Sequence, residues 1–433
     1  MKIKIDSHIM IEKIILILSI FFVMLLWVLK LYKLANIVAS MTLLIDIYGC
    51  IKVRKNKINF FMFLTMLYFD YSFIITKYYY NIKSFSALYA QIRFEDTKFI
   101  GITLVYLFHA ILLLLLKPSF FENKDDMFIV NSNEKIKGKK KIFIFALIVM
   151  IGFIITDYLI FHVFNIPRTI YEYMIIPFII AIYYSKNNEP LSILILLLIM
   201  VSFLINSSQG GRIISLQPLI AFFFIKYYNK VNSKRIFLVF IVGIILFTLL
   251  GLYGDNLMGD NQTLTINNTL NVLNERKFAL DTSYSAYWTG LTFIETSHYI
   301  PFKNRIRNFI QYVTTYLLFG KASKYNELTS ISIKYYGHWN GGYLPHYFYY
   351  WFGPLGIIVL ALYIAFFFNK FASCNSNSSD YFKILYVYFV SAMPRWYLYS
   401  PAQIFRGVFL LTVVYFVVYI FINNDKSKKE INN

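Results

Sequence analysis

Residues 14–29 read IILILSIFFVMLLWVL, a run whose only polar side chain is Ser19. A helix needs about 20 mainly apolar residues to cross a bilayer, and runs of similar character recur along nearly the whole chain. The 433 residues are 58% hydrophobic and 20% aromatic, with a mean hydropathy of +0.57. Soluble domains average roughly 45–50% apolar residues. The composition therefore predicts an all-α polytopic membrane protein and argues against a soluble globular core.

The apolar runs predict about 12 transmembrane helices, and the stretch between the ninth and tenth is a large outer loop. The spans are expected at residues 14–30, 34–51, 58–76, 99–116, 142–164, 169–184, 190–206, 212–228, 236–252, 345–368, 381–394 and 405–422. No small-residue cleavage site follows the first run, so we interpret it as a retained helix and not as a signal peptide. The expected regions are the N-terminal helices 1–252 (about nine spans), the loop 253–344 with interfacial helices, and the C-terminal region 345–433 with about three spans and a tail.

The net charge of +20 is concentrated in alternate connections between the apolar runs. Lysine and arginine favour the cytoplasmic side of short connections. KVRKNK, NEKIKGKKK and the terminal KSKKE belong to that basic side, so both termini are predicted to be cytoplasmic and the 253–344 loop to face out. This pattern, without a nucleic-acid motif, also argues against a nucleic-acid partner. Cys50 and Cys374 fall on the cytoplasmic side, where free thiols are expected.

The outer loop contains KNRIRNFIQYVTTYLLFG at 303–320, in which Arg305 and Arg307 precede an apolar stretch. This pattern predicts an amphipathic helix at the outer membrane interface. Loops of about ninety residues are uncommon and usually functional. The chain has no internal repeat, which argues against a transporter built from repeated halves.

Ionisable residues within or beside the predicted spans gather near the outer leaflet. Such residues are costly in a bilayer and are candidates for function, although snorkelling and structural ion pairing are alternatives. Asp46 and His109 are exceptions, since both lie nearer the inner face. Supporting ion pairs are expected from Asp70, Asp157 and Glu172. The outer group comprises Asp70, Asp157, His162, Arg168, Glu172, Arg212, Arg395 and Arg406.

SSQGGR at 207–212 comes directly before a predicted helix. Gly210 and Gly211 allow backbone N–H groups to approach a ligand, and Arg212 adds a guanidinium at the helix N-terminus. Such an arrangement suits an anion, above all a phosphate. A plain turn between two helices is the alternative.

PRWYLYSPAQIFR at 394–406 places Arg395 and Arg406 on either side of four aromatic side chains. The arginines could bind a second phosphate or pair with Asp70 or Asp157. The aromatics could stack on sugar rings, or they could form part of the interfacial belt.

GHWNGGYLPHYFYYWFGPLG at 337–356 combines polar groups and glycines with an aromatic run. His338 is a candidate general base because imidazole changes charge near neutral pH. Asn340 could orient a hydroxyl or the imidazole. His346 and His298 are competing candidates.

The segment HWNGGYLPHYFYYWFGPLGIIVLAL resembles the end of the large outer loop in the O-antigen ligase and polymerase superfamily. The GGR that opens an earlier span is similar to a Gly-x-Arg segment of the same proteins. This resemblance implies a GT-C-like, metal-independent glycosyltransferase without a cofactor, in the bacterial inner membrane. By resemblance, the catalytic residues are His338 and Asn340, and the diphosphate-binding residues are Gly210, Gly211, Arg212, Arg395 and Arg406. Trp339 separates the His from the Asn and departs from the family pattern, which leaves the role of His338 open.

The resemblance implies that the donor is an oligosaccharide on undecaprenyl diphosphate. A polymerase would transfer it to another lipid-linked repeat unit, giving O-antigen or capsule, and a ligase would transfer it to lipid A–core. A polymerase is the favoured reading. Membrane lipids, a chain-length regulator and a flippase are the implied partners. The alternatives from other classes are a flippase or transporter for lipid-linked oligosaccharides, and a membrane O-acyltransferase, for which only His109 could serve.

Overall fold

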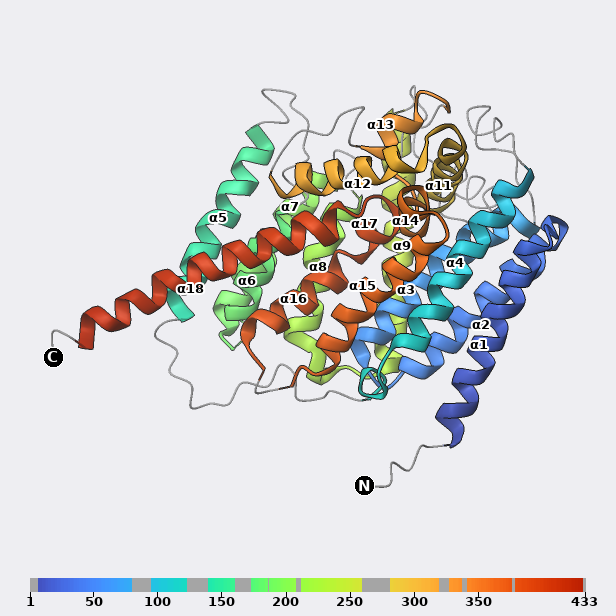
Figure 1. Ribbon diagram of the computed structural model, residues 1–433. Coiled ribbons are helices and arrows are strands. Elements are labelled where there is room, and N and C mark those ends of the chain that lie inside the picture. Colours follow the sequence, from blue (N-terminus) through green and yellow to red (C-terminus); the bar gives the residue numbers. More distant parts are fainter. Residues whose placement is uncertain are drawn as a thin grey trace. The chain divides into compact units, whose positions relative to one another are not determined.

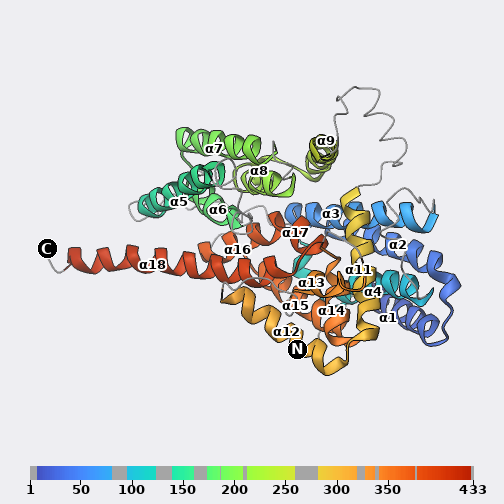
Figure 2. The same cartoon turned by 90° about the horizontal axis from the view of Figure 1, so that it is seen from above.

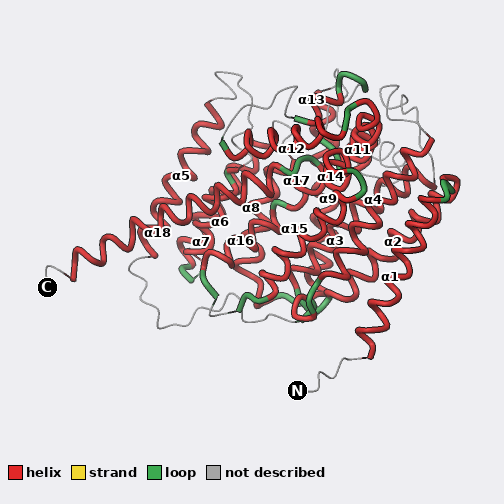
Figure 3. Tube along the Cα trace, viewed as in Figure 1, coloured by secondary structure: helices red, strands yellow, loops and turns green. Residues whose placement is uncertain are grey.

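The computed structural model describes residues 7–79, 95–122, 139–159, 173–185, 187–207, 212–258, 281–318, 327–336, 341–375 and 378–430. Every regular element in these ranges is a helix (Figures 1 and 3). The all-α prediction is therefore confirmed for the described part of the chain. The helices form two compact units, which are residues 1–122, 270–373 and 396–402, and residues 123–269, 374–395 and 403–433.

The first unit contains most of the longest apolar helices. Its elements are α1 (Ser7–Val28), η1 (Tyr32–Leu34), α2 (Ala35–Val53), α3 (Lys57–Ile74), η2 (Ile75–Tyr79), α4 (Glu95–Leu115), η4 (Pro118–Phe120), α11 (Asp281–Tyr299), α12 (Phe302–Leu317), α13 (Leu328–Ser332), α14 (Leu344–Phe352) and α15 (Leu355–Ala372).

Helices α3 and α4 form the interior of this unit. Helix α2 packs against both, α1 packs on α4, and α15 packs on the opposite side of α4 (Figure 1). In the view of Figure 2, α11 lies against α3 and α14. Most of α3 and α4 is buried, whereas α1 exposes large apolar side chains along its length. This distribution fits a bilayer, where an exposed apolar helix faces lipid and close packing holds the inner helices together.

Polar side chains fix the ends of these helices. Asn56 caps α3 by accepting a hydrogen bond from the backbone N–H of Asn59 at 3.3 Å. The Asn369 side chain donates to the carbonyl of Leu115 at 3.0 Å and accepts from the N–H of Lys117 at 2.8 Å. These bonds satisfy backbone groups that a helix end leaves without partners, and they join α15 to the end of α4.

The predicted span at 345–368 is wrong in its boundaries, because the structure has two helices there. Helix α14 ends at Gly353, whose φ of 62° lies in the left-handed region that favours glycine. Pro354 follows, and α15 then begins at Leu355. Only α15 is long and apolar enough to cross a membrane, over Leu355–Ala372. Helix α14 is a separate element whose first eight residues are buried.

The second unit contains α5 (Lys139–Leu159), α6 (Ile175–Ser185), α7 (Glu189–Ser207), α8 (Arg212–Tyr227), η7 (Tyr228–Lys230), α9 (Ser233–Met258), α16 (Asp380–Ser391), η8 (Gln403–Gly407) and α18 (Val408–Glu430). Helix α6 is its most buried element and contacts α5, α7, α8 and α16. The Tyr183 hydroxyl on α6 donates to Asp380 on α16 at 2.6 Å. The short helix α17 (Met393–Leu398) crosses the boundary between the two units.

Six helices in the described ranges are long and apolar enough to span a bilayer. They are Ile9–Val28, Tyr32–Val53, Lys57–Tyr79, Asp96–Leu115, Glu189–Asn206 and Leu355–Ala372. Shorter apolar helices occupy Ile142–Thr156, Ile175–Ser185 and Gln403–Val417. The chain is therefore compatible with a helical membrane protein, while twelve spans and an outer loop stay predictions.

Candidate functional site

Two of the segments singled out in the sequence lie against each other in the first unit. Residues 341–350 follow the predicted catalytic pair, and residues 396–400 follow Arg395. The Tyr347 hydroxyl donates to the carbonyl of Tyr399 at 3.0 Å. A Cβ on Gly341 would overlap the same Tyr399 carbonyl. Glycine at this position therefore permits the close approach of the two backbones.

Helix α12 covers this junction. The Tyr312 hydroxyl forms a 2.8 Å hydrogen bond with the Ser400 hydroxyl. Arg305 donates to the carbonyl of Tyr350 at 2.9 Å, and the Asn308 amide donates to the Tyr350 hydroxyl at 2.8 Å. The predicted helix after Arg305 is thus present as a 16-residue helix that packs on α14, and it is not among the helices apolar enough to span a bilayer.

His346 lies inside the unit, between α11 and α4. Its Nε2 is 3.2 Å from the carbonyl of Gly101, and a Cβ on Gly290 would overlap its Nδ1. A carbonyl can only accept, so Nε2 carries the proton and Nδ1 is the acceptor nitrogen. The side chain is fully buried and fills the space that Gly290 leaves. His346 is therefore packed in the interior of the unit, and the choice between His338 and His346 as the base stays a prediction.

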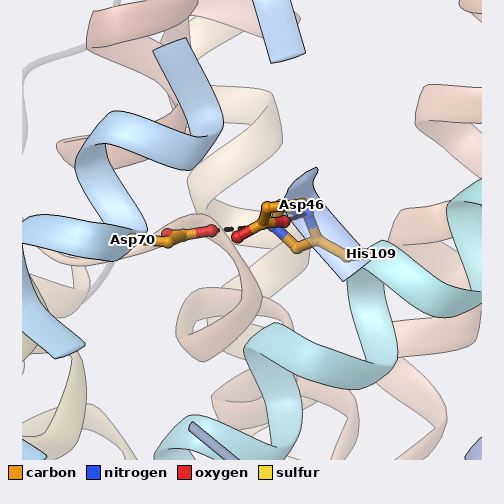
Figure 4. A group of neighbouring side chains, drawn as sticks. All are labelled: Asp46, Asp70 and His109. Carbon is orange, nitrogen blue, oxygen red and sulfur yellow. Dashed lines mark ion pairs between the residues drawn. The ribbon is translucent and has the colours of Figure 1, made fainter. Parts of the chain in front are cut away.

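Three ionisable side chains meet in the interior of the first unit, on α2, α3 and α4 (Figure 4). His109 Nδ1 is 2.6 Å from Asp46 Oδ1, and His109 Nε2 is 3.1 Å from Asp70 Oδ2. At most 1% of each side chain is exposed. The imidazole thus lies between two carboxyl groups, one at each ring nitrogen. We call Asp46, His109 and Asp70 the buried triad.

Tyr397 completes the surroundings of the buried triad. Its hydroxyl lies 3.0 and 2.9 Å from the two oxygens of Asp70 and 2.8 Å from His109 Nε2. The Tyr397 ring packs edge-on against Tyr343 at 5.2 Å, and Tyr343 follows Gly341 and Gly342 directly. The buried triad is therefore connected through two aromatic side chains to the junction of the two segments.

The buried triad has a donor set that could hold a metal ion, since one ligand atom from each residue lies within 4.8 Å of the others. Carboxylate and imidazole ligands suit zinc and related ions. However, each imidazole nitrogen is already at hydrogen-bonding or ion-pairing distance from a carboxyl oxygen. A metal ion would have to displace one of these contacts, so the geometry favours a hydrogen-bonded ionic group.

Only some of the remaining predicted site residues belong to the described part of the chain. His338, Asn340, Gly210, Gly211 and Glu172 lie outside the described residues, as do His162 and Arg168. Arg212 begins α8 as expected, and Asp157 lies on α5, but their side chains are not described.

Arg395 and Arg406 are both half-buried residues of the second unit. The guanidinium of Arg406 lies over the ring of Tyr173, 5.9 Å from its centre. Asp70 lies at ion-pairing distance from His109 and accepts a hydrogen bond from the Tyr397 hydroxyl, whereas the sequence suggested an arginine as its partner.

The sequence reasoning treated Asp46 and His109 as exceptions to the outer cluster and did not bring them to Asp70. The available signal was their chemistry, since both are ionisable residues inside long apolar helices. Comparison with known protein families, with curated proteins and with solved structures gives no match for this chain.

Proposed function

We propose that this chain is a membrane-embedded glycosyltransferase that polymerises saccharide repeat units carried on undecaprenyl diphosphate. The observation that supports it is the junction in the first unit, where the segment after His338 and Asn340 packs on the segment after Arg395. In the proposed reaction, His338 accepts the proton of the attacking hydroxyl, and Asn340 orients that hydroxyl or the imidazole. Arg212, Arg395 and Arg406 stabilise the negative charge that develops on the departing diphosphate.

Arginine suits this role because it is planar, always charged and able to form two parallel hydrogen bonds to phosphate. Stabilisation of a developing charge by fixed donors is commonly the largest contribution to catalysis. Such a reaction needs no metal ion. The acceptor is a second lipid-linked unit in a polymerase and lipid A–core in a ligase.

The test is elongation by the purified protein in liposomes that contain the lipid-linked repeat unit. We expect products of increasing length from the wild type. Arg212→Ala and His338→Ala should each reduce elongation at least tenfold, since removing a single transition-state donor costs on the order of 10²–10³ in rate. Arg307→Ala is the matched control, because Arg307 is exposed on α12 and has no role in the proposal. Normal elongation by well-folded Arg212→Ala and His338→Ala variants would contradict the proposed mechanism.

A flippase for the same lipid-linked saccharides is the second candidate, and the buried triad is the observation that favours it. Transport through a membrane commonly uses ionisable residues placed deep within the helices. The liposome assay separates the two candidates. A flippase would move the lipid-linked unit between leaflets without lengthening it, whereas a polymerase would lengthen it.

A further inference from the structure

The side chains of the buried triad do not balance one another's charges. Two carboxylates and one imidazolium leave one net negative charge in the interior of the first unit. The ion pairs recorded for Asp46, Asp70 and His109 within the described residues involve no lysine or arginine. A charge without a counter-ion is very costly in an apolar interior.

The neighbouring titratable groups do not supply the missing positive charge. Those that interact electrostatically with the two carboxyl groups are Cys50 on α2, Tyr287 on α11, Tyr343 before α14 and Tyr397 on α17. Thiol and phenol groups are neutral at physiological pH and become negative when they lose a proton. These four neighbours of the buried triad are therefore neutral or acidic and supply no positive charge.

The two carboxyl groups differ in their hydrogen bonds. Both oxygens of Asp70 are within hydrogen-bonding distance of the Tyr397 hydroxyl, and His109 reaches one of them as well. Asp46 has His109 Nδ1 beside Oδ1 at ion-pairing distance, but neither of its buried oxygens has a hydrogen-bond partner among the described residues. A buried carboxylate oxygen without a donor is rare and unfavourable. Asp46 is thus the carboxyl group better suited to being neutral, and Asp70 the one better suited to being charged.

We infer that the buried triad is a proton-binding site, which holds one proton on its carboxyl groups in addition to the proton of the imidazolium. The additional proton resides mainly on Asp46 and makes the whole group electrically neutral. Its release exposes the interior of the unit to a net negative charge next to Tyr397. Because Tyr397 lies two residues before Tyr399, proton release acts on the segment that packs on Gly341. This inference does not depend on the proposed glycosyl transfer.

The direct measurement is the infrared C=O stretching band of a protonated carboxyl group, recorded on the full chain in lipid nanodiscs at neutral pH. Asp46→Asn and Asp70→Asn each leave one carboxylate opposite the imidazolium. The remaining pair is then neutral without an additional proton. Each variant should therefore lose the band that the wild type shows for one carboxyl group. His109→Gln removes the positive charge, so both carboxyl groups need a proton and the band should grow roughly twofold.

Asp380→Asn is the matched control, since Asp380 also accepts a tyrosine hydrogen bond but is only partly buried. It should leave the band unchanged. Any protonated carboxyl group outside the buried triad cancels in the difference between wild type and variant. The two asparagine variants keep the shape of the side chain, and either one that folds is sufficient for the test.

A second readout is the melting temperature against pH. The wild type should lose stability at high pH, where the proton leaves, and Asp46→Asn should lose less. The proposal is overturned if neither asparagine variant changes the band. It is also overturned if the purified wild type holds a stoichiometric divalent metal whose removal by EDTA lowers its melting temperature, because the buried triad would then be a metal site.

Discussion

At the residue scale, the junction between residues 341–350 and 396–400 depends on the absence of a side chain at Gly341. Gly341 lies against the backbone carbonyl of Tyr399, and Gly342 lies against the ring of Phe293. A flexible side chain can move aside, but a backbone carbonyl held by Tyr347 cannot do so cheaply. Gly341 is therefore needed for packing.

We predict that Gly341→Ala destabilises the protein by about 1–3 kcal/mol, the usual range for overpacking a tight contact. It should also reduce elongation in the liposome assay, because it moves the segment that follows His338. Gly152→Ala on α5 is the matched control, since a Cβ there meets no atom within 4 Å. The control should be neutral or stabilising by up to ~1 kcal/mol, because alanine is the better helix former. Equal melting temperatures for Gly341→Ala and the wild type would contradict this packing argument.

The meeting of the three residues of the buried triad could not be predicted from the sequence. Asp46, Asp70 and His109 were recognisable as unusual residues in apolar helices. Their meeting could not be predicted, because a helix that is apolar on all sides gives no sign of which face turns inward. The rotation of each helix is set by packing against its neighbours, and that information is absent from the hydropathy pattern.

At the element scale, α12 is attached to α14 by few polar contacts. Arg305 donates to the Tyr350 carbonyl and also lies over the ring of Phe302 at 5.3 Å. Arg307, two residues later on the same helix, is exposed. The two arginines therefore differ in their contacts and exposure, although they looked equivalent in the sequence.

Arg305→Ala should lower the unfolding free energy by roughly 1–2 kcal/mol, because it removes a charged hydrogen-bond donor from a partly buried carbonyl. Arg307→Ala should change it by less than about 0.5 kcal/mol, as is usual for exposed positions. Denaturant unfolding followed by tryptophan fluorescence in detergent measures both. An equal loss in the two variants would show that charge alone, and not the contact with α14, holds α12 in place.

Glu327, which precedes α13, gives a pH dependence of defined sign. Burial raises the pKa of Glu327 above its ordinary value of 4.5, although hydrogen bonds from Tyr316 and Thr329 oppose part of this rise. The folded state thus binds this proton more tightly than the unfolded state does. Its contribution to stability is full below the unfolded pKa and is lost as the pH rises through the folded pKa.

We therefore expect Glu327→Gln to flatten the fall in melting temperature between mildly acidic and neutral pH. Glu122→Gln, at an exposed position, should leave the wild-type curve unchanged. The buried triad contributes a dependence of the same sign, so the Glu327→Gln and Asp46→Asn effects should add if the two groups are independent. A Glu327→Gln curve that runs parallel to that of the wild type would contradict the assignment.

The helices themselves were the most predictable feature at this scale. Long apolar runs between basic connections gave α1 to α4 and α7 almost directly, because length and hydrophobicity suffice to define a spanning helix. The Gly353–Pro354 break was missed, since proline and glycine are tolerated inside membrane helices and do not by themselves show where one ends. The positive φ of Gly353 became visible only in the structure.

At the scale of the whole molecule, orientation in the membrane is the main prediction that the sequence makes. Lysine and arginine lie in the connections assigned to the cytoplasm, and the loop at 253–344 is assigned to the outside. Net charge alone would not give this result, because orientation depends on the distribution of basic residues over the short loops.

Fusion proteins test this orientation. Alkaline phosphatase inserted within 253–344 should be active, because the enzyme requires export, and a fluorescent protein at the C-terminus should fluoresce. The same reporters exchanged between the two positions should both be inactive and are the matched control. Activity of the phosphatase at the C-terminus would place that tail outside and reverse the predicted topology.

The corner between α14 and α15 has a mechanical consequence. Gly353 donates to the carbonyl of Tyr349, and Gly356 lies so close to the Phe348 carbonyl that no Cβ would fit between them. These contacts hold the start of α15 against the end of α14, so we expect the two helices to move together. A displacement of Gly341 and Gly342, which precede α14, would then also displace α15. Because α15 is long and apolar enough to span a bilayer, we expect the packing at the junction to depend on bilayer thickness.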